Sequence, residues 1–256
     1  MVLIDTHVHL YSEEFQADFH SVISKAKENG VEKMLMPNVD IHSIEKMNEI
    51  AKTYPGLCFP MIGLHPCYVK EDFQIQLEDM KAELDSGKYI GVGEIGLDLY
   101  WDKTFYEEQK ISFETQLKWA IEKKLPVSIH SRSATREALE IIKQLSDKQL
   151  MGVFHCFSGT LEEAKEITKL GLYLGIGGVI TFKNGGLDKI LSEIPLKNII
   201  LETDAPYLAP IPFRGKRNES SYLTFVAKKV AEIFNLSTEE VGRITSENAF
   251  SLFSLT

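Results

Sequence analysis

The sequence predicts an α/β protein, a (β/α)8 TIM barrel with an extra C-terminal helix. Eight short β-rich runs alternate with amphipathic stretches, which is typical of parallel strands joined by crossover helices. The length of 256 residues matches the roughly 250 residues of one such barrel, so we expect a single domain over 1–256. Most of the runs also end in a histidine or an acid, and only a closed barrel gathers so many strand ends at one place.

Each expected strand is a short apolar run followed by a turn. The strands are predicted at 3–9, 31–37, 58–65, 89–96, 126–130, 151–156, 172–177 and 198–204. Helical patterns are predicted at 12–29, 41–54, 70–86, 105–124, 134–146, 161–170, 185–193 and 220–235. A ninth helix is expected over 238–252, because Ser237 and Glu240 have the spacing of a capping box.

Composition narrows the class of protein. The net charge of −9 and the pI of about 5.4 disfavour a protein that coats long stretches of nucleic acid. The three cysteines have no CxxC spacing and argue against a disulfide framework. No apolar run approaches the ~20 residues of a membrane span, and the N-terminus has no basic segment of a secretory signal. We therefore expect a cytoplasmic protein with no membrane association and no evident obligate protein partner.

Six residues at strand ends form a candidate set of metal ligands. His7 and His9 are two apart on one strand, so both imidazoles project from the same face. The others end four later strands, and imidazoles with carboxylates suit a divalent cation such as Zn²⁺, Mn²⁺ or Mg²⁺. The six residues are His7, His9, Glu94, His130, His155 and Asp204.

The two acids in this set have candidate catalytic roles. Glu94 is flanked by Gly93 and Gly96, which permit close backbone approach, and its two oxygens could bridge two cations. Asp204 follows an apolar run and could also accept a proton from a metal-activated water; Glu202 would share its face. The alternatives are a solvated glutamate, a helix cap at Asp204 and a histidine pair satisfied by hydrogen bonds.

Five further residues are candidates for substrate binding. His65 ends the third strand without a place in the ligand set, so we assign it to substrate contact. The connection over 205–219 carries Arg214, Lys216 and Arg217, and Arg132 follows His130. Guanidinium groups match phosphate oxygens, although a short charge run is also typical of a solvated loop. The aromatics around 100–106 could stack unpaired bases or pack in the core.

These residues resemble the TatD family of metal-dependent deoxyribonucleases, within the amidohydrolase-like barrels. The motifs are Asp5-Thr6-His7-Val8-His9, Gly63-Leu64-His65-Pro66, Gly93-Glu94-Ile95-Gly96-Leu97-Asp98, His130-Ser131-Arg132, His155-Cys156-Phe157-Ser158-Gly159, Glu202-Thr203-Asp204-Ala205-Pro206-Tyr207-Leu208 and Arg214-Gly215-Lys216-Arg217-Asn218. Two positions depart from the family pattern: Ser133, and Ser220 where a proline commonly follows the glutamate. They affect substrate contacts and not the reaction class.

The resemblance implies two ions and a phosphodiesterase. His7, His9, Glu94 and Asp204 would hold one ion, and Glu94, His130 and His155 the second. The expected function is an exonuclease-like deoxyribonuclease that acts on single-stranded or short DNA. One alternative is an amidohydrolase-type enzyme acting on a small amide, lactone or base. Another is a non-catalytic binding module stabilised by metal.

Overall fold

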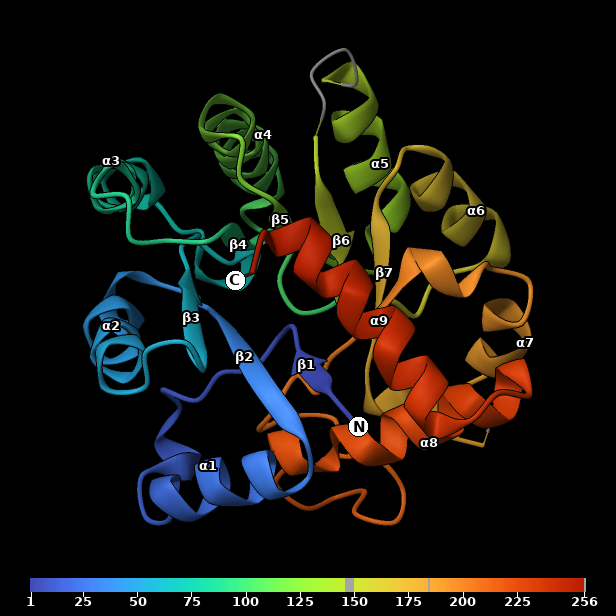
Figure 1. Cartoon of the computed structure of the whole chain (residues 1–256). Helices are drawn as coiled ribbons and strands as arrows, with labels where there is room; N and C mark the ends of the chain where they lie inside the picture. The colour runs from blue at the N-terminus through green and yellow to red at the C-terminus, as the bar shows by residue number, and fades with distance from the viewer. Residues whose placement is uncertain (146–149, 184, 256) are drawn as a thin grey trace.

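The computed structural model describes residues 1–145, 150–183 and 185–255, and in these residues it is a closed barrel of parallel strands surrounded by helices (Figure 1). The strands are β1 Leu3–Asp5, β2 Val31–Pro37, β3 Cys58–Met61, β4 Val92–Asp98, β5 Val127–Arg132, β6 Gly152–Phe154, β7 Tyr173–Ile176 and β8 Ile199–Leu201. The predicted eight-stranded α/β barrel is therefore confirmed, with several strands shorter than expected.

Two local parallel sheets make up the barrel wall. One has the order β1-β2-β3 and the other β4-β5-β6-β7-β8. Single bridges join them, between Ile62 and Val92 on one side and between Val8 and Ala205 on the other. Hydrogen bonds from Thr6 N to Leu201 O (3.2 Å) and from His9 N to Ala205 O (2.8 Å) close the wall. An open sheet is thereby excluded.

The helices follow the strands in the predicted order. They are α1 Phe19–Glu28, α2 Ile44–Thr53, α3 Phe73–Asp85, α4 Tyr106–Lys123, α5 Thr135–Gln144, α6 Leu161–Lys169, α7 Leu187–Leu191, α8 Leu223–Phe234 and α9 Thr238–Phe253. Ser237 caps α9 as predicted, since its side chain accepts a hydrogen bond from Glu240 N (3.1 Å). The predicted end of the fifth helix, Ser146, lies outside the described residues.

Three predicted helices begin with or contain a short 3₁₀ turn, and the one at 41–54 opens with η2 Ile41–Ser43 directly before α2. The stretch expected as one helix over 12–29 contains a short 3₁₀ turn, η1 Glu13–Phe15, and then α1. The Phe15 side chain at the end of this turn is buried in the core. The stretch at 220–235 likewise begins with the 3₁₀ turn η6 Ser220–Tyr222 before α8. Both η1 and η6 adjoin the connection from β8 to α8, since Arg217 of that connection donates to Glu14 O in η1, and η6 follows the connection directly.

The extra helix α9 closes one end of the barrel. Ala249, Leu252 and Phe253 of α9 pack with inward-facing residues from several strands, and Figure 1 shows α9, in red, lying across the barrel. The strand residues in this cluster are Ile4, Leu35, Met61, Val153 and Ile200. The chemically distinctive residues lie at the opposite, carboxyl ends of the strands. No helix in the described part of the chain is both long and apolar enough to cross a membrane.

Candidate metal centre

The carboxyl ends of the strands surround a cavity of about 860 Å³. Its lining includes His9, His65, Glu94, His130, His155 and Asp204. His7 lies just beneath, fully buried, with its ring stacked on that of His155 (centroids 3.7 Å apart). All six predicted ligands therefore meet at one face, as the barrel prediction required.

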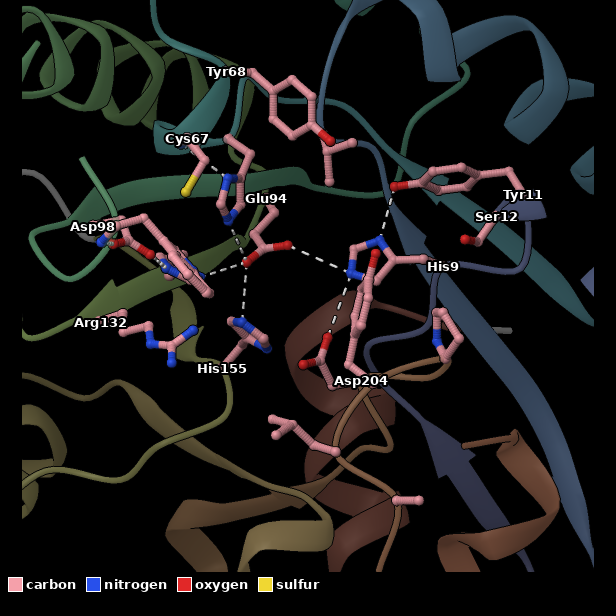
Figure 2. Close-up of a pocket in the computed structure, with 18 of the residues that line it drawn as sticks. His9, Tyr11, Ser12, Cys67, Tyr68, Glu94, Asp98, Arg132, His155 and Asp204 are labelled. Carbon is pink, nitrogen blue, oxygen red and sulfur yellow. Dashed lines mark hydrogen bonds and ion pairs between the residues drawn. The ribbon is translucent and has the colours of Figure 1, made fainter. Parts of the chain in front are cut away.

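Glu94 lies at the centre of the group, and its two oxygens face different neighbours (Figure 2). Oε2 lies 3.2 Å from His7 Nε2 and 3.6 Å from His9 Nε2. Oε1 lies 2.8 Å from His130 Nδ1 and 3.0 Å from His155 Nε2. One carboxylate thus connects two groups of imidazoles, which is the arrangement of a bridging ligand.

The first group is completed by Asp204. Its Oδ1 lies 3.4 Å from His9 Nε2 and 3.8 Å from His7 Nε2, and the two imidazole nitrogens are 3.3 Å apart. Four ligands held at about 2.1 Å from a tetrahedral ion lie about 3.4 Å from one another. His7 Nε2 and His9 Nε2 lie 3.2–3.8 Å from Asp204 Oδ1 and Glu94 Oε2, which is the spacing and chemistry that fit one divalent cation.

The outward-facing nitrogens of the four histidines show how the rings are oriented. His9 Nδ1 lies 2.8 Å from Tyr11 Oη, and that hydroxyl donates to Pro37 O (2.7 Å). Because the Tyr11 proton is used there, Tyr11 Oη must accept a hydrogen bond from His9 Nδ1–H. The inward Nε2 of His9 then carries a free lone pair, as metal ligation requires.

Carboxylates orient two further imidazoles in the same way. His130 Nε2 donates to Asp98 Oδ2 (2.9 Å), and His155 Nδ1 lies 3.3 Å from Glu202 Oε1. His7 Nδ1 contacts Ser128 Oγ (3.1 Å). Outer partners of this kind fix the tautomer and raise the basicity of a ligating imidazole. The outer contacts of His9 and His130 therefore leave the nitrogen that faces Glu94 free to bind a cation when the ring is neutral.

His65 has the opposite orientation. Its Nε2 lies 3.3 Å from Glu94 Oε1, within the second group of donor atoms. Its Nδ1, however, accepts a hydrogen bond from Cys67 N (3.1 Å), so the proton of the neutral ring is on Nε2. Burial lowers the pKa of His65, which favours that neutral form. His65 is therefore a hydrogen-bond donor pointing into the site, and not a lone-pair ligand.

The ionisation of the two acids follows from the imidazoles around them. Burial alone would raise the pKa of Glu94, but His65, His155 and His7 outweigh it and hold that pKa well below its usual value. The pKa of Asp204 is also lowered, because its hydrogen bond to His9 and the nearby imidazoles overcome burial. Both acids are ionised at neutral pH, as a cation site requires.

The pKa values of the imidazoles shift in opposite directions, according to the groups that surround each ring. Burial and the neighbouring His155 lower the pKa of His7. Burial also acts on His155, but Glu94 and Glu202 outweigh it and raise its pKa well above the usual value. The pKa of His130 is raised because hydrogen bonds to Asp98 and Glu94 overcome burial. The cluster therefore attracts positive charge, and metal binding there would release protons.

Backbone geometry at the acids explains two features of the sequence. Gly96 has φ +144°, and a Cβ there would lie 1.9 Å from His130 O, so only glycine lets β4 approach β5 this closely. Asp204 has φ +58° in the left-handed region, which Asp and Asn tolerate better than most residues. The residues that directly follow Asp204 form a turn and no helix starts there, so the alternative of a helix cap is wrong.

The predicted basic residues separate into two classes. Arg132, Arg214 and Lys216 line the cavity, and within the described part of the chain no carboxylate lies within ion-pair distance of them. Arg217 instead makes a bidentate pair with Asp18, with both distances 2.7 Å, and donates to Glu14 O. It is not among the cavity-lining residues. The prediction of Arg217 as a substrate contact is therefore replaced by an anchoring role for the 205–219 connection.

The sequence analysis placed Glu202 on the same face as Asp204 but overlooked Asp98, Tyr11 and Ser128. Strand alternation could have found two of them. Tyr11 continues the spacing of His7 and His9, and Asp98 lies four residues after Glu94 on β4. Ser128 carries no such signal, because a serine on a buried strand has no distinctive pattern.

Comparison with known proteins agrees with the site. The family profile described as TatD related DNase matches residues 4–254. The chain is 38% identical over 255 residues to the uncharacterized metal-dependent hydrolase YabD of Bacillus subtilis, covering 99% of this chain and 100% of that protein. It is 32% identical over 259 residues to the 3'-5' ssDNA/RNA exonuclease TatD of Yersinia pseudotuberculosis, covering 99% and 100%.

A solved structure supports the same relationship. The crystal structure of YjjV, the TatD homolog from Escherichia coli, aligns with a TM-score of 0.93 at 29% identity. The alignment covers 99% of this chain and 98% of that one. Full-length coverage by the family profile and by relatives above 30% identity, together with a His/Glu/Asp centre suited to divalent metal, shows that the chain belongs to the TatD family of metal-dependent hydrolases.

Proposed function

We propose that this protein is an exonuclease-like deoxyribonuclease that hydrolyses phosphodiester bonds, with single-stranded nucleic acid as its substrate class. The observation that carries the proposal is the position of Glu94, whose two oxygens face separate histidine groups on the floor of a cavity lined by three unpaired cations. The Yersinia relative is named as a single-strand exonuclease for DNA and RNA, which supports this substrate class.

Two divalent ions fit the donor set. His7, His9, Asp204 and Glu94 Oε2 would hold the first, and Glu94 Oε1, His130 and His155 the second. Four imidazoles favour Zn²⁺, with Mn²⁺ next and Mg²⁺ last, because Mg²⁺ prefers oxygen ligands. When bound, such ions polarise a phosphoryl group and lower the pKa of a water towards neutrality.

The chain's own residues supply the remaining chemistry. Asp204 is ionised and reaches the cavity, so it can orient a water and accept its proton. His65 donates its Nε2–H towards the same floor and can hydrogen-bond a phosphoryl oxygen. Arg132, Arg214 and Lys216 can hold the charged oxygens of the phosphate. Residues 1–256 would act as one unit, because the site draws ligands from β1 to the end of β8.

The two alternative functions fit less well. A small neutral amide or lactone carries no negative charge that Arg132, Arg214 and Lys216 at the cavity could bind. A purely structural ion is normally enclosed by its four protein ligands, whereas this group opens into a cavity of about 860 Å³. We therefore retain phosphodiester hydrolysis.

Metal removal tests the proposed function directly. Dialysis against a chelator should abolish cleavage of an end-labelled single-stranded oligonucleotide, and Zn²⁺ or Mn²⁺ should restore it. Elemental analysis should find close to two ions per chain before dialysis. A protein whose cleavage survives complete metal removal would contradict the metal-dependent mechanism. A protein that contains metal but cleaves no oligonucleotide would contradict the nuclease proposal alone.

The unpaired cations lead to a prediction about substrate charge. Replacing Arg214 and Lys216 together by Gln should raise the KM for an oligonucleotide by about 10-fold, because two solvent-exposed ion pairs are typically worth up to about 1 kcal/mol each. The salt dependence of log KM should also become shallower by roughly 1–2, since fewer counterions are released on binding. Metal content should remain the same, because neither residue belongs to the ligand groups.

A matched control separates this local effect from the change in net charge. Lys165 and Lys189 are exposed on α6 and α7 and do not line the cavity. Replacing both by Gln removes the same charge and should leave the KM and the salt dependence close to those of the unmodified protein. Equal effects of the two double variants would show that Arg214 and Lys216 act only through the overall charge.

A further inference from the structure

We propose that Trp101, with Tyr100 and Arg132, forms a stacking platform for an unpaired base at the mouth of the metal cavity. The proposal rests on the proposed nuclease function and adds a residue that selects single-stranded substrate. Tyr100 and Trp101 lie in the loop between β4 and α4, Arg132 is the last residue of β5, and Trp101 and Arg132 both line the cavity.

The three side chains form one compact unit. The guanidinium carbon of Arg132 lies 3.9 Å from the centre of the Tyr100 ring and 5.1 Å from that of Trp101. The two rings meet edge to face, with centroids 5.0 Å apart and an interplanar angle of 86°. Trp101 is nevertheless 68% exposed, although burial of an indole this large would be strongly favourable. An open ring beside a functional cavity is a surface suited to a ligand with a flat apolar face.

Asp98, which also contacts His130 of the metal centre, holds the loop that carries Tyr100 and Trp101. Asp98 Oδ1 accepts hydrogen bonds from Tyr100 N (2.9 Å) and Trp101 N (3.0 Å), while its Oδ2 accepts from His130 Nε2 (2.9 Å). Gln109 is buried, and its Oε1 accepts from Asp98 N (3.0 Å). The same carboxylate therefore orients an imidazole of the metal centre and positions the backbone of the aromatic pair.

The chemistry of the ligand follows from what surrounds the platform. Arg132 has no carboxylate partner in the described residues, so it can bind a phosphate while its plane stays on the rings. A flat apolar group joined to a phosphate is a nucleotide. Bases within a duplex are already stacked on their neighbours, whereas an unpaired base has free faces that aromatic side chains can cover. The platform therefore favours an unpaired base next to the scissile phosphate.

The first test compares substrates with and without a base. We expect the unmodified protein to cleave a single-stranded oligonucleotide with a kcat/KM about 10-fold above that for the same strand with abasic residues at its ends, since stacking on one ring is typically worth about this much. In Trp101→Ala this ratio should fall towards 1, and in Trp101→Phe part of it should remain. Ile111→Ala is the control, because Ile111 is 52% exposed on α4 but does not line the cavity, and it should keep the full ratio.

The second test needs no turnover. Trp101 and Trp119 are the only tryptophans, and Trp119 is 8% exposed, so Trp119→Phe leaves Trp101 as the sole reporter. Titrating the metal-loaded variant with deoxyadenosine monophosphate should quench its fluorescence, whereas deoxyribose 5-phosphate should not. If the variant does not fold, the unmodified protein can be titrated instead. Deoxyadenosine monophosphate should again quench more fluorescence than deoxyribose 5-phosphate, while the contribution of the buried Trp119 stays constant.

The two tests distinguish failure of the platform from failure of the nuclease. If Trp101→Ala keeps the full ratio while the unmodified protein cleaves oligonucleotides, the platform is overturned and the proposed function stands. If the unmodified protein cleaves none, the proposed function is overturned, and the titration still decides whether Trp101 stacks on a base. Equal fluorescence traces with both ligands would overturn the platform in either case.

Discussion

Glu94→Gln should lower kcat/KM for an oligonucleotide by about 10²–10³-fold, the loss typical of removing one electrostatic group from an active site. The substitution retains the size of the side chain but removes the negative charge that faces imidazoles on both sides. An amide nitrogen also replaces one of the two oxygens that serve the two groups. We expect both ions to be bound more weakly, which elemental analysis after dialysis would measure.

Two other substitutions calibrate this loss. His9→Ala removes a donor from the first group only, so it should cost less than Glu94→Gln and leave one ion in place. Glu202→Gln acts through its contact with His155, and changing such an outer partner typically costs about 10–100-fold. If Glu94→Gln and His9→Ala reduce activity and metal content equally, the bridging role of Glu94 is contradicted.

Asp204→Asn should reduce kcat by about 10²–10⁴-fold, the range typical of removing a general base. The amide keeps an oxygen that can still ligate, but it cannot accept a proton. Asn also tolerates the left-handed backbone at φ +58°, so the fold and the melting temperature should be preserved. The KM and the metal content should change little, which steady-state kinetics and elemental analysis would show.

Asp79→Asn makes the same chemical change at an exposed position on α3 outside the metal cavity. Its kcat should match that of the unmodified protein. Near-normal turnover in Asp204→Asn, with normal metal content, would mean that another group accepts the proton. Loss of metal together with turnover would instead identify Asp204 as a ligand with no separate role as a base.

The ligand candidates could be predicted because their signals are local. His7 and His9 follow the two-residue period of a strand, and the other four lie at or near the ends of apolar runs. Parallel strands joined by helices direct all their carboxyl ends to one face, so residues distant in sequence could be placed together without coordinates.

The roles of the basic residues could not be read in the same way. The local sequence does not distinguish the three basic residues Arg214, Lys216 and Arg217 from one another, yet only the first two line the cavity. Arg217 pairs with Asp18, 199 positions away, and no local pattern encodes that contact. The turn η1 could not be predicted for the same reason. The centre of its Phe15 ring lies 5.0 Å from the guanidinium carbon of Arg217, which is distant in the sequence.

By itself, therefore, the sequence determined the fold class, the family and the identity of the residues at the metal centre, because periodicity and strand-end chemistry are properties of short segments. Only the tertiary structure decided which ring nitrogen of His7 and of His130 faces Glu94, since that depends on Ser128 and Asp98, which lie far from them in the sequence. It also distinguished His65, whose proton is directed inward by the hydrogen bond from Cys67 N. The orientations of His7 and His130 are set by contacts between strands, and the linear order of residues does not contain those contacts.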